Sequence, residues 1–110
     1  MMRKGTVFMN GTVAGTITEI IGEGYVFEYD DGYLSNPSLP AISLTLPKVK
    51  KTYTSATLFP FFANMLSEGA NRTVQARLHH VDRDDDFGIL LATASVDTPG
   101  AVTIMKVDDD

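Results

Sequence analysis

The first part of the chain alternates apolar and polar residues as β-strands do. Residues 7–9 lead into Asn10-Gly11, and residues 12–20 follow with many β-branched side chains. Asn-Gly readily adopts positive φ at both positions of a two-residue turn, so we predict a β-hairpin here. Residues 25–29 predict a third strand, which Asp30-Asp31-Gly32 closes.

A fourth strand is predicted in a segment that is bounded by prolines. Ile42, Leu44 and Leu46 alternate with polar residues, which is the pattern of a short half-buried strand. Pro40 and Pro47 flank it. Proline cannot donate a ladder hydrogen bond, so the strand is expected at a sheet edge, or the prolines mark its ends.

Helical spacing replaces the alternation after residue 57. Thr57 is a candidate N-cap, Pro60 is tolerated in a first helical turn, and Gly69 is a natural C-terminal stop. An apolar stripe at helical spacing runs along this segment, formed by Leu58, Phe61, Phe62, Met65 and Leu66.

Two more helices and a final strand are predicted downstream. One helix spans about residues 71–80, with Val74, Leu78 and Val81 on one side. Another begins after Asp84-Asp85-Asp86, because carboxylates favour a helix N-terminus. Its expected buried residues are Phe87, Leu90, Leu91 and Ala94. Residues 101–107 predict the last strand, and the acidic tail 108–110 is expected to fray.

This order of elements predicts the α+β class in a single domain over residues 1–110. We expect a small antiparallel sheet or partial barrel of about five strands, packed by about three helices. The 110 residues include 44% hydrophobic and 21% charged residues, which suits a folded domain with its own core.

The composition argues against several classes of function. The chain has no cysteine, so disulfides, thiolate metal sites and cysteine nucleophiles are absent. A net charge of −5 repels phosphate backbones, so no direct nucleic-acid binding is expected. No signal peptide or apolar run of membrane-spanning length is visible, which predicts a cytoplasmic protein without a membrane partner.

Sequence motifs for catalysis, cofactors and metals are also missing. The glycines form neither a phosphate-binding loop nor a dinucleotide fingerprint. His79 and His80 are adjacent on a predicted helix, so their side chains would diverge instead of sharing a metal. A calcium loop from Asp82 would need glycine and glutamate where Phe87 and Thr93 stand. We therefore expect a non-enzyme without a cofactor or metal.

Two features are candidates for contacts with a partner. Phe59, Phe61 and Phe62 suit core packing better than a ligand box, but Phe59 is offset from the stripe, where an exposed aromatic would indicate a partner contact. A polar segment between two predicted helices is either an ordinary connection or a binding loop. It consists of Ser67, Glu68, Gly69, Ala70, Asn71 and Arg72.

Several motifs in chain order resemble the N-terminal domain of HipA kinases. Residues 58–69 are similar to the "FFxNLLPEG" block of that family. Residues 86–91, followed by 99–104, are similar to its "DxFxLL…(S/P)GAV" ending. Earlier segments match in the same order, so the resemblance runs from about residue 3 to 107: residues 7–15, 25–29 and 42–47.

The resemblance implies a partner and a mechanism. In that family the domain precedes a serine/threonine kinase core, the toxin of a toxin–antitoxin module, which a HipB-like helix-turn-helix protein usually binds. A freestanding version resembles the HipS-like component of three-gene HipBST modules, where the split-off domain is the antitoxin of the HipT kinase. The domain would dock on the N-lobe of the kinase, with residues 67–71 facing the nucleotide or substrate cleft.

One departure from the family bears on inhibition. Many relatives place a bulky aromatic residue directly after the Glu-Gly pair, whereas this chain has Ala70 and no tryptophan. An aromatic plug is therefore missing, and Glu68, Asn71 or Arg72 would have to act instead. Two other hypotheses stay open: a non-inhibitory N-terminal subunit of a split kinase, and a small-ligand-binding module unrelated to kinases.

Overall fold

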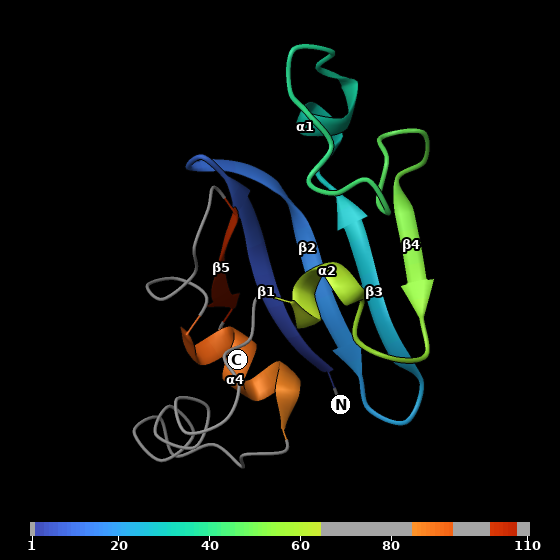
Figure 1. Ribbon diagram of the computed structural model, residues 1–110, viewed down its shortest axis with the longest axis vertical. Coiled ribbons are helices and arrows are strands. Elements are labelled where there is room, and N and C mark those ends of the chain that lie inside the picture. Colours follow the sequence, from blue (N-terminus) through green and yellow to red (C-terminus); the bar gives the residue numbers. More distant parts are fainter. Residues whose placement is uncertain (1, 65–84, 94–101, 108–110) are drawn as a thin grey trace.

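A computed structural model describes residues 2–64, 85–93 and 102–107 of the chain (Figure 1). Its strands are β1 (Met2–Met9), β2 (Thr12–Ile20), β3 (Gly24–Tyr29), β4 (Thr52–Ser55) and β5 (Val102–Val107). Its helices are α1 (Asp31–Ser35), α2 (Pro60–Ala63) and α4 (Asp86–Thr93). The predicted helix over residues 71–80, as well as Met65, Leu66, Gly69, Ala94 and the tail, lies outside the described residues.

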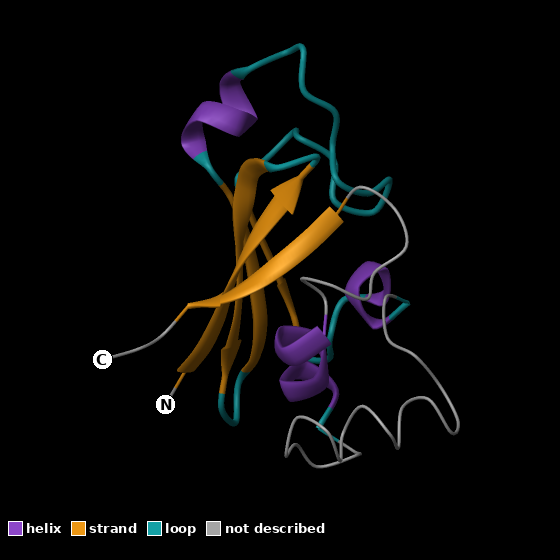
Figure 2. Ribbon diagram, turned by 90° about the vertical axis from the view of Figure 1, so that its left-hand side faces the viewer, coloured by secondary structure: helices purple, strands orange, loops and turns teal. Residues whose placement is uncertain are grey.

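The five strands form one open antiparallel sheet in the order β4-β3-β2-β1-β5. β5, the last strand of the chain, returns beside β1 at one edge (Figure 1). Figure 2 shows α2 and α4 on the same side of the sheet. The predicted α+β class with about five strands is therefore confirmed.

The predicted hairpin between β1 and β2 is also confirmed. Asn10 and Gly11 have φ values of 51° and 83°, so both turn positions lie in the left-handed region that Asn-Gly tolerates. The register shifts beside Phe8, because Val7 pairs with Gly15 while Phe8 pairs with Val13. Ala14 is the extra residue of this β-bulge.

The two faces of the sheet have different surroundings. Successive side chains of a strand point to opposite faces, so the registers place Gly5, Ile17 and Phe27 together on the helix side. Ile17 and Phe27 are fully buried there. The opposite side, which we call the open face, carries two rows across all five strands. These rows are Thr54, Val26, Thr18, Lys4, Val107 and Thr52, Glu28, Thr16, Thr6, Met105.

The hydrophobic core lies between the sheet and α2 and α4. Phe87 and Leu90 of α4 are fully buried, as the helical pattern predicted, and Leu91 is 6% exposed. Asp85 precedes α4, and its carboxylate accepts the Gly88 N–H at 3.1 Å. This contact satisfies an unpaired donor of the first turn, as expected of an acidic helix start.

The predicted strand over residues 41–46 is wrong. Ile42 and Leu46 are buried, but Leu44 is fully exposed on a turn, where the Leu46 N–H donates to the Ser43 carbonyl at 3.1 Å. The edge strand is instead β4, which pairs with β3. Its sequence contains Tyr53 as the only large apolar side chain, so alternation gives little signal there.

A short helix that was not predicted follows β3, and one predicted helix start is wrong. Asp30 follows the end of β3, as predicted, and its carboxylate also accepts the Tyr33 N–H at 3.2 Å and caps the short helix α1. Thr57 does not cap α2. The N-cap is Phe59, with no capping hydrogen bond from its side chain, and Pro60 begins the helix. Proline already has the φ value of a first helical turn, so it sets this start.

Candidate functional site

Phe59 is buried, so the exposure on which its predicted partner contact depended is absent. Its side chain is 7% exposed, and its ring lies edge-on to that of Phe62 at 6.2 Å between centroids. The residue precedes the helix with φ −55° and ψ 137°, instead of lying on a helical face. This extended conformation allows Phe59 to join the core.

The predicted binding loop lies outside the described residues. Its members Ser67, Glu68, Gly69, Ala70, Asn71 and Arg72 therefore keep the status of predictions. The described chain stops short of them at Asn64, whose N–H donates to the Pro60 carbonyl at 2.9 Å. It resumes at Asp85, directly before α4.

A polar cluster ties the start of α4 to β1 and β2, and we call Arg3, Glu19, Tyr25 and Asp85 the Arg3 cluster. The guanidinium of Arg3 donates to both carboxylate oxygens of Asp85, at 2.8 and 2.9 Å. Its Nε donates to Glu19 at 2.7 Å. The Tyr25 hydroxyl donates to the other Glu19 oxygen at 3.2 Å. Bidentate pairing of this kind fixes geometry as well as adding energy.

The charges of the Arg3 cluster stabilise one another. Hydrogen bonds from Arg3 lower the pKa of Asp85, against an opposing effect of burial, and the Gly88 N–H lowers it further. The same carboxylate raises the pKa of Arg3. Burial, followed by the negative charge of Glu19, raises the pKa of Tyr25, so its phenol stays protonated. The cluster is a set of mutually satisfied groups, which indicates a structural role.

The stability that Asp85 contributes should therefore be lost at low pH. Its pKa in the folded protein is below the ordinary 3.8, so its contribution is present above 3.8 and is lost as the pH falls through the folded value. We expect Asp85→Asn to cost about 1–2 kcal/mol at pH 7, because partial exposure screens the pair. Urea unfolding should show that difference shrinking toward pH 2.

The matched control is Asp31→Asn, because Asp31 is 82% exposed and pairs with Lys51 on the surface. This variant should unfold like the wild type at both ends of the pH range. A loss of stability in Asp85→Asn that stays constant with pH would contradict the assigned charge of Asp85.

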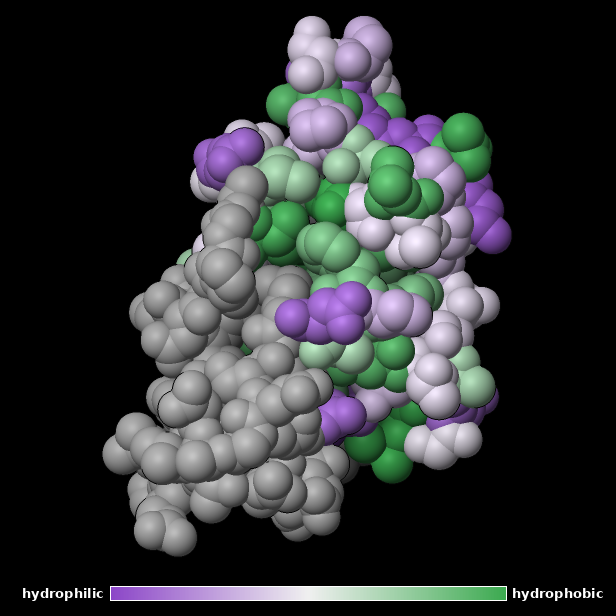
Figure 3. Space-filling view, viewed as in Figure 1, coloured by the Kyte–Doolittle hydropathy of each residue, from purple (hydrophilic) through white to green (hydrophobic). Residues whose placement is uncertain are grey.

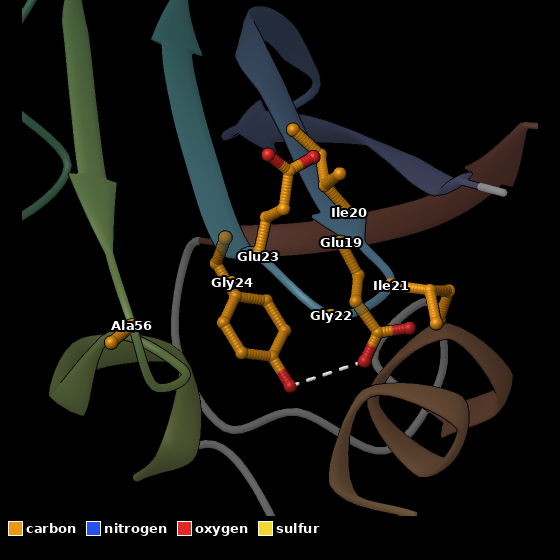
Figure 4. Close-up of a pocket in the computed structure, with 8 residues that line it drawn as sticks. Glu19, Ile20, Ile21, Gly22, Glu23, Gly24 and Ala56 are labelled. Carbon is orange, nitrogen blue, oxygen red and sulfur yellow. Dashed lines mark hydrogen bonds between the residues drawn. The ribbon is translucent and has the colours of Figure 1, made fainter.

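A shallow hollow of about 460 Å³ lies at the turn between β2 and β3 (Figure 4). Its carboxylates come from Glu19 and Glu23. Figure 4 shows them pointing apart, with Glu19 bonded to the Tyr25 hydroxyl. Glu19 is also held by Arg3. The two groups therefore do not converge on a ligand or a cation.

The described residues do not bring together the side chains of a metal centre. Across residues 2–64, 85–93 and 102–107, no group of three or more histidine, cysteine or carboxylate side chains gathers as metal ligands would. None of the described helices is long and apolar enough to cross a membrane.

A loop of residues 36–51 that is held by side-chain hydrogen bonds is a feature that the sequence pattern did not indicate. The Tyr33 hydroxyl donates to the Pro40 carbonyl at 2.6 Å, and the Tyr29 hydroxyl donates to the Leu46 carbonyl. Lys48 Nζ donates to the carbonyls of Asn36 and Leu39, at 2.6 and 2.7 Å. We call this segment the tyrosine-held loop.

The tyrosine-held loop presents two exposed apolar side chains. Leu44 is 100% exposed and Val49 is 85% exposed, on successive turns. Figure 3 shows isolated hydrophobic surface at the upper right of the molecule, where Figure 1 places the loop before β4. Alternation could not predict that these side chains are exposed, because side chains from outside the loop hold its backbone.

The fold and these contacts define a small α+β domain, in which short helices cover one face of an open antiparallel sheet. The chain belongs to the HipA N-terminal domain family, whose sequence profile matches residues 5–105. A solved structure described as the N-terminal domain of HipA toxin superposes with a TM-score of 0.72 at 28% identity, covering 98% of this chain and 95% of that one.

Relatives of two kinds share this domain. An uncharacterized protein of Haemophilus influenzae is 32% identical over 106 residues, which cover 96% of this chain and 94% of that protein. Two Sinorhizobium fredii proteins, "Putative kinase Y4mE" and "Putative kinase Y4dM", are 27% and 29% identical across 99% of this chain. The chain spans only 26% and 29% of their lengths.

Proposed function

We propose that this chain is a separately acting HipA N-terminal domain that binds a HipA-type serine/threonine kinase core and inhibits it as an antitoxin. One observation carries the proposal: the domain accounts for nearly the whole Haemophilus influenzae relative, but for about a quarter of the Sinorhizobium fredii proteins named as kinases. A domain that occurs both alone and joined to a larger chain is suited to bind that larger part as a separate protein.

The proposed mechanism acts through binding alone. The domain would dock on the N-lobe of the kinase and hold it in a less active state, which requires stronger binding to that state than to the active one. Residues 67–71 would face the cleft. Ala70 is too small to plug it, so Glu68, Asn71 and Arg72 are the candidates for polar contacts. The chain itself would act as a non-enzyme in the cytoplasm.

Further partners follow from the same proposal. A HipB-like helix-turn-helix protein would join the complex and contact DNA. The chain, with a net charge of −5, would reach DNA only through such a partner. The alternative, a non-inhibitory subunit of a split kinase, has equal support from the relatives named as kinases. It predicts the same complex, but without inhibition of the kinase.

The experiment that tests this proposal is growth of cells that express a HipA-type kinase core from the same genome, with and without this chain. We expect the chain to restore growth and to co-purify with the kinase. Glu68→Ala and Asn71→Ala should weaken rescue, whereas Leu44→Ala, on the tyrosine-held loop, serves as a control and should not. Co-purification without rescue would favour the split-kinase alternative, and no co-purification would contradict both.

A further inference from the structure

The open face of the sheet differs from the other surfaces of this acidic chain. Half of its ten positions are threonines, and its only charged residues are Lys4 and Glu28, which cancel. Because only two of these ten side chains are charged, a partner that covers the face has few charges to desolvate or to pair. The open face is also hollowed by about 290 Å³ between Lys4, Thr18, Val26 and their neighbours.

Exposed apolar side chains lie on β5 and on the central strand β2 of this face. The described chain has six large apolar residues that are markedly exposed, and three of them lie here: Val13 at 41%, Met105 at 55% and Val107 at 38%. Val13 pairs with Phe8, and Phe8 pairs with Thr103 of β5. Thr103 and Met105 are two positions apart on β5 and so point to the same side, which places Val13 on the open side as well. Such clusters mark interaction sites more often than single exposed residues do.

The path of β5 indicates which partner would cover the open face. Figure 2 shows β5, the edge strand, beginning near the helix side and ending on the side away from α2 and α4. The family is by its description an N-terminal domain, and it fills about a quarter of the kinase relatives. In those relatives the remaining chain therefore follows the end of β5, next to the open face.

From the neutral, partly apolar surface and this continuity, we propose that the open face, centred on Met105, Val107 and Thr18, is the surface that docks on the kinase core. This inference rests on the proposed function and adds the location of its interface. The kinase segment that adjoins β5 in the fused relatives would occupy the same face when it belongs to a separate chain.

The test is a calorimetric titration of the purified kinase core with the wild-type chain and two pairs of variants. Met105→Asp and Thr18→Glu place a negative charge on the open face. Leu44→Asp and Val49→Asp place the same charge on exposed apolar positions of the tyrosine-held loop. All four variants have the same net charge, so a general electrostatic effect would act on both pairs alike. Urea unfolding should verify that each variant is folded.

We expect the open-face pair to weaken binding on the order of tenfold or more, while the loop pair retains the wild-type affinity. Wild-type affinity in Met105→Asp and Thr18→Glu would overturn this inference and leave the proposed function standing. A loss confined to the loop pair would also overturn it. Absence of binding by the wild type would instead contradict the proposed function. If Met105→Asp abolishes only self-association of the chain, the face binds a second copy and the inference fails.

Discussion

Replacing Phe62 by alanine should lower the free energy of unfolding by about 3–5 kcal/mol. Phe62 is fully buried, and its ring lies 5.8 Å from that of Phe27 on the sheet and 5.2 Å from that of Phe61. The four residues of α2 are too few to form a stable helix by themselves. The Phe62 side chain therefore holds α2 on β3.

Urea denaturation followed by circular dichroism measures this loss. Phe61→Ala is the matched control, because it removes the same type of side chain from the same helix, and Phe61 is only half-buried. Its cost should be clearly smaller. Equal stabilities of the two variants would contradict the packing described for α2. Since most small domains have about 5–15 kcal/mol of total stability, Phe62→Ala should leave a noticeably unfolded population in warm cells.

Replacing Tyr29 by phenylalanine should cost about 2–4 kcal/mol, although it removes only one oxygen atom. The Tyr29 hydroxyl donates to the Leu46 carbonyl and accepts the Ile42 N–H at 3.2 Å. Tyr29 is 1% exposed, and Ile42 and Leu46 are buried as well. Both backbone groups would lose their partner in a place that water does not readily reach, at about 1–2 kcal/mol each.

Amide hydrogen exchange distinguishes this local effect from general unfolding. The Ile42 amide should lose protection in Tyr29→Phe, while amides of β1 and β2 keep theirs. Tyr53→Phe is the control, because its hydroxyl also donates to a loop carbonyl, that of Pro47, but the side chain is only half-buried. Unchanged protection of Ile42 in Tyr29→Phe would show that the hydroxyl does not hold the loop.

Local patterns predicted those elements whose causes are local. Asn10-Gly11 specifies a turn by its own φ preferences, and the spacing of Phe87, Leu90 and Leu91 specifies the buried side of α4. The tyrosine-held loop was mistaken for a strand because Ile42, Leu44 and Leu46 alternate. Alternation cannot reveal that the backbone bonds to tyrosine hydroxyls instead of to a neighbouring strand.

The candidate site was predicted less completely for a related reason. Phe59 was placed on the side of a helix starting at Leu58, but the helix starts at Pro60 and leaves Phe59 in an extended position that reaches the core. The contact between Arg3 and Asp85 joins residues 82 positions apart, a distance over which one sequence carries no pairing signal. The open face likewise exists only through the register of five strands.

The central claim is that this chain binds a HipA-type kinase core as a separate protein. Sedimentation of the purified chain mixed with the purified kinase core, compared with each alone, tests it most directly. We expect a complex that is heavier than the kinase core by the 12.0 kDa of this chain. Two independent species at concentrations well above those in a cell would contradict the claim.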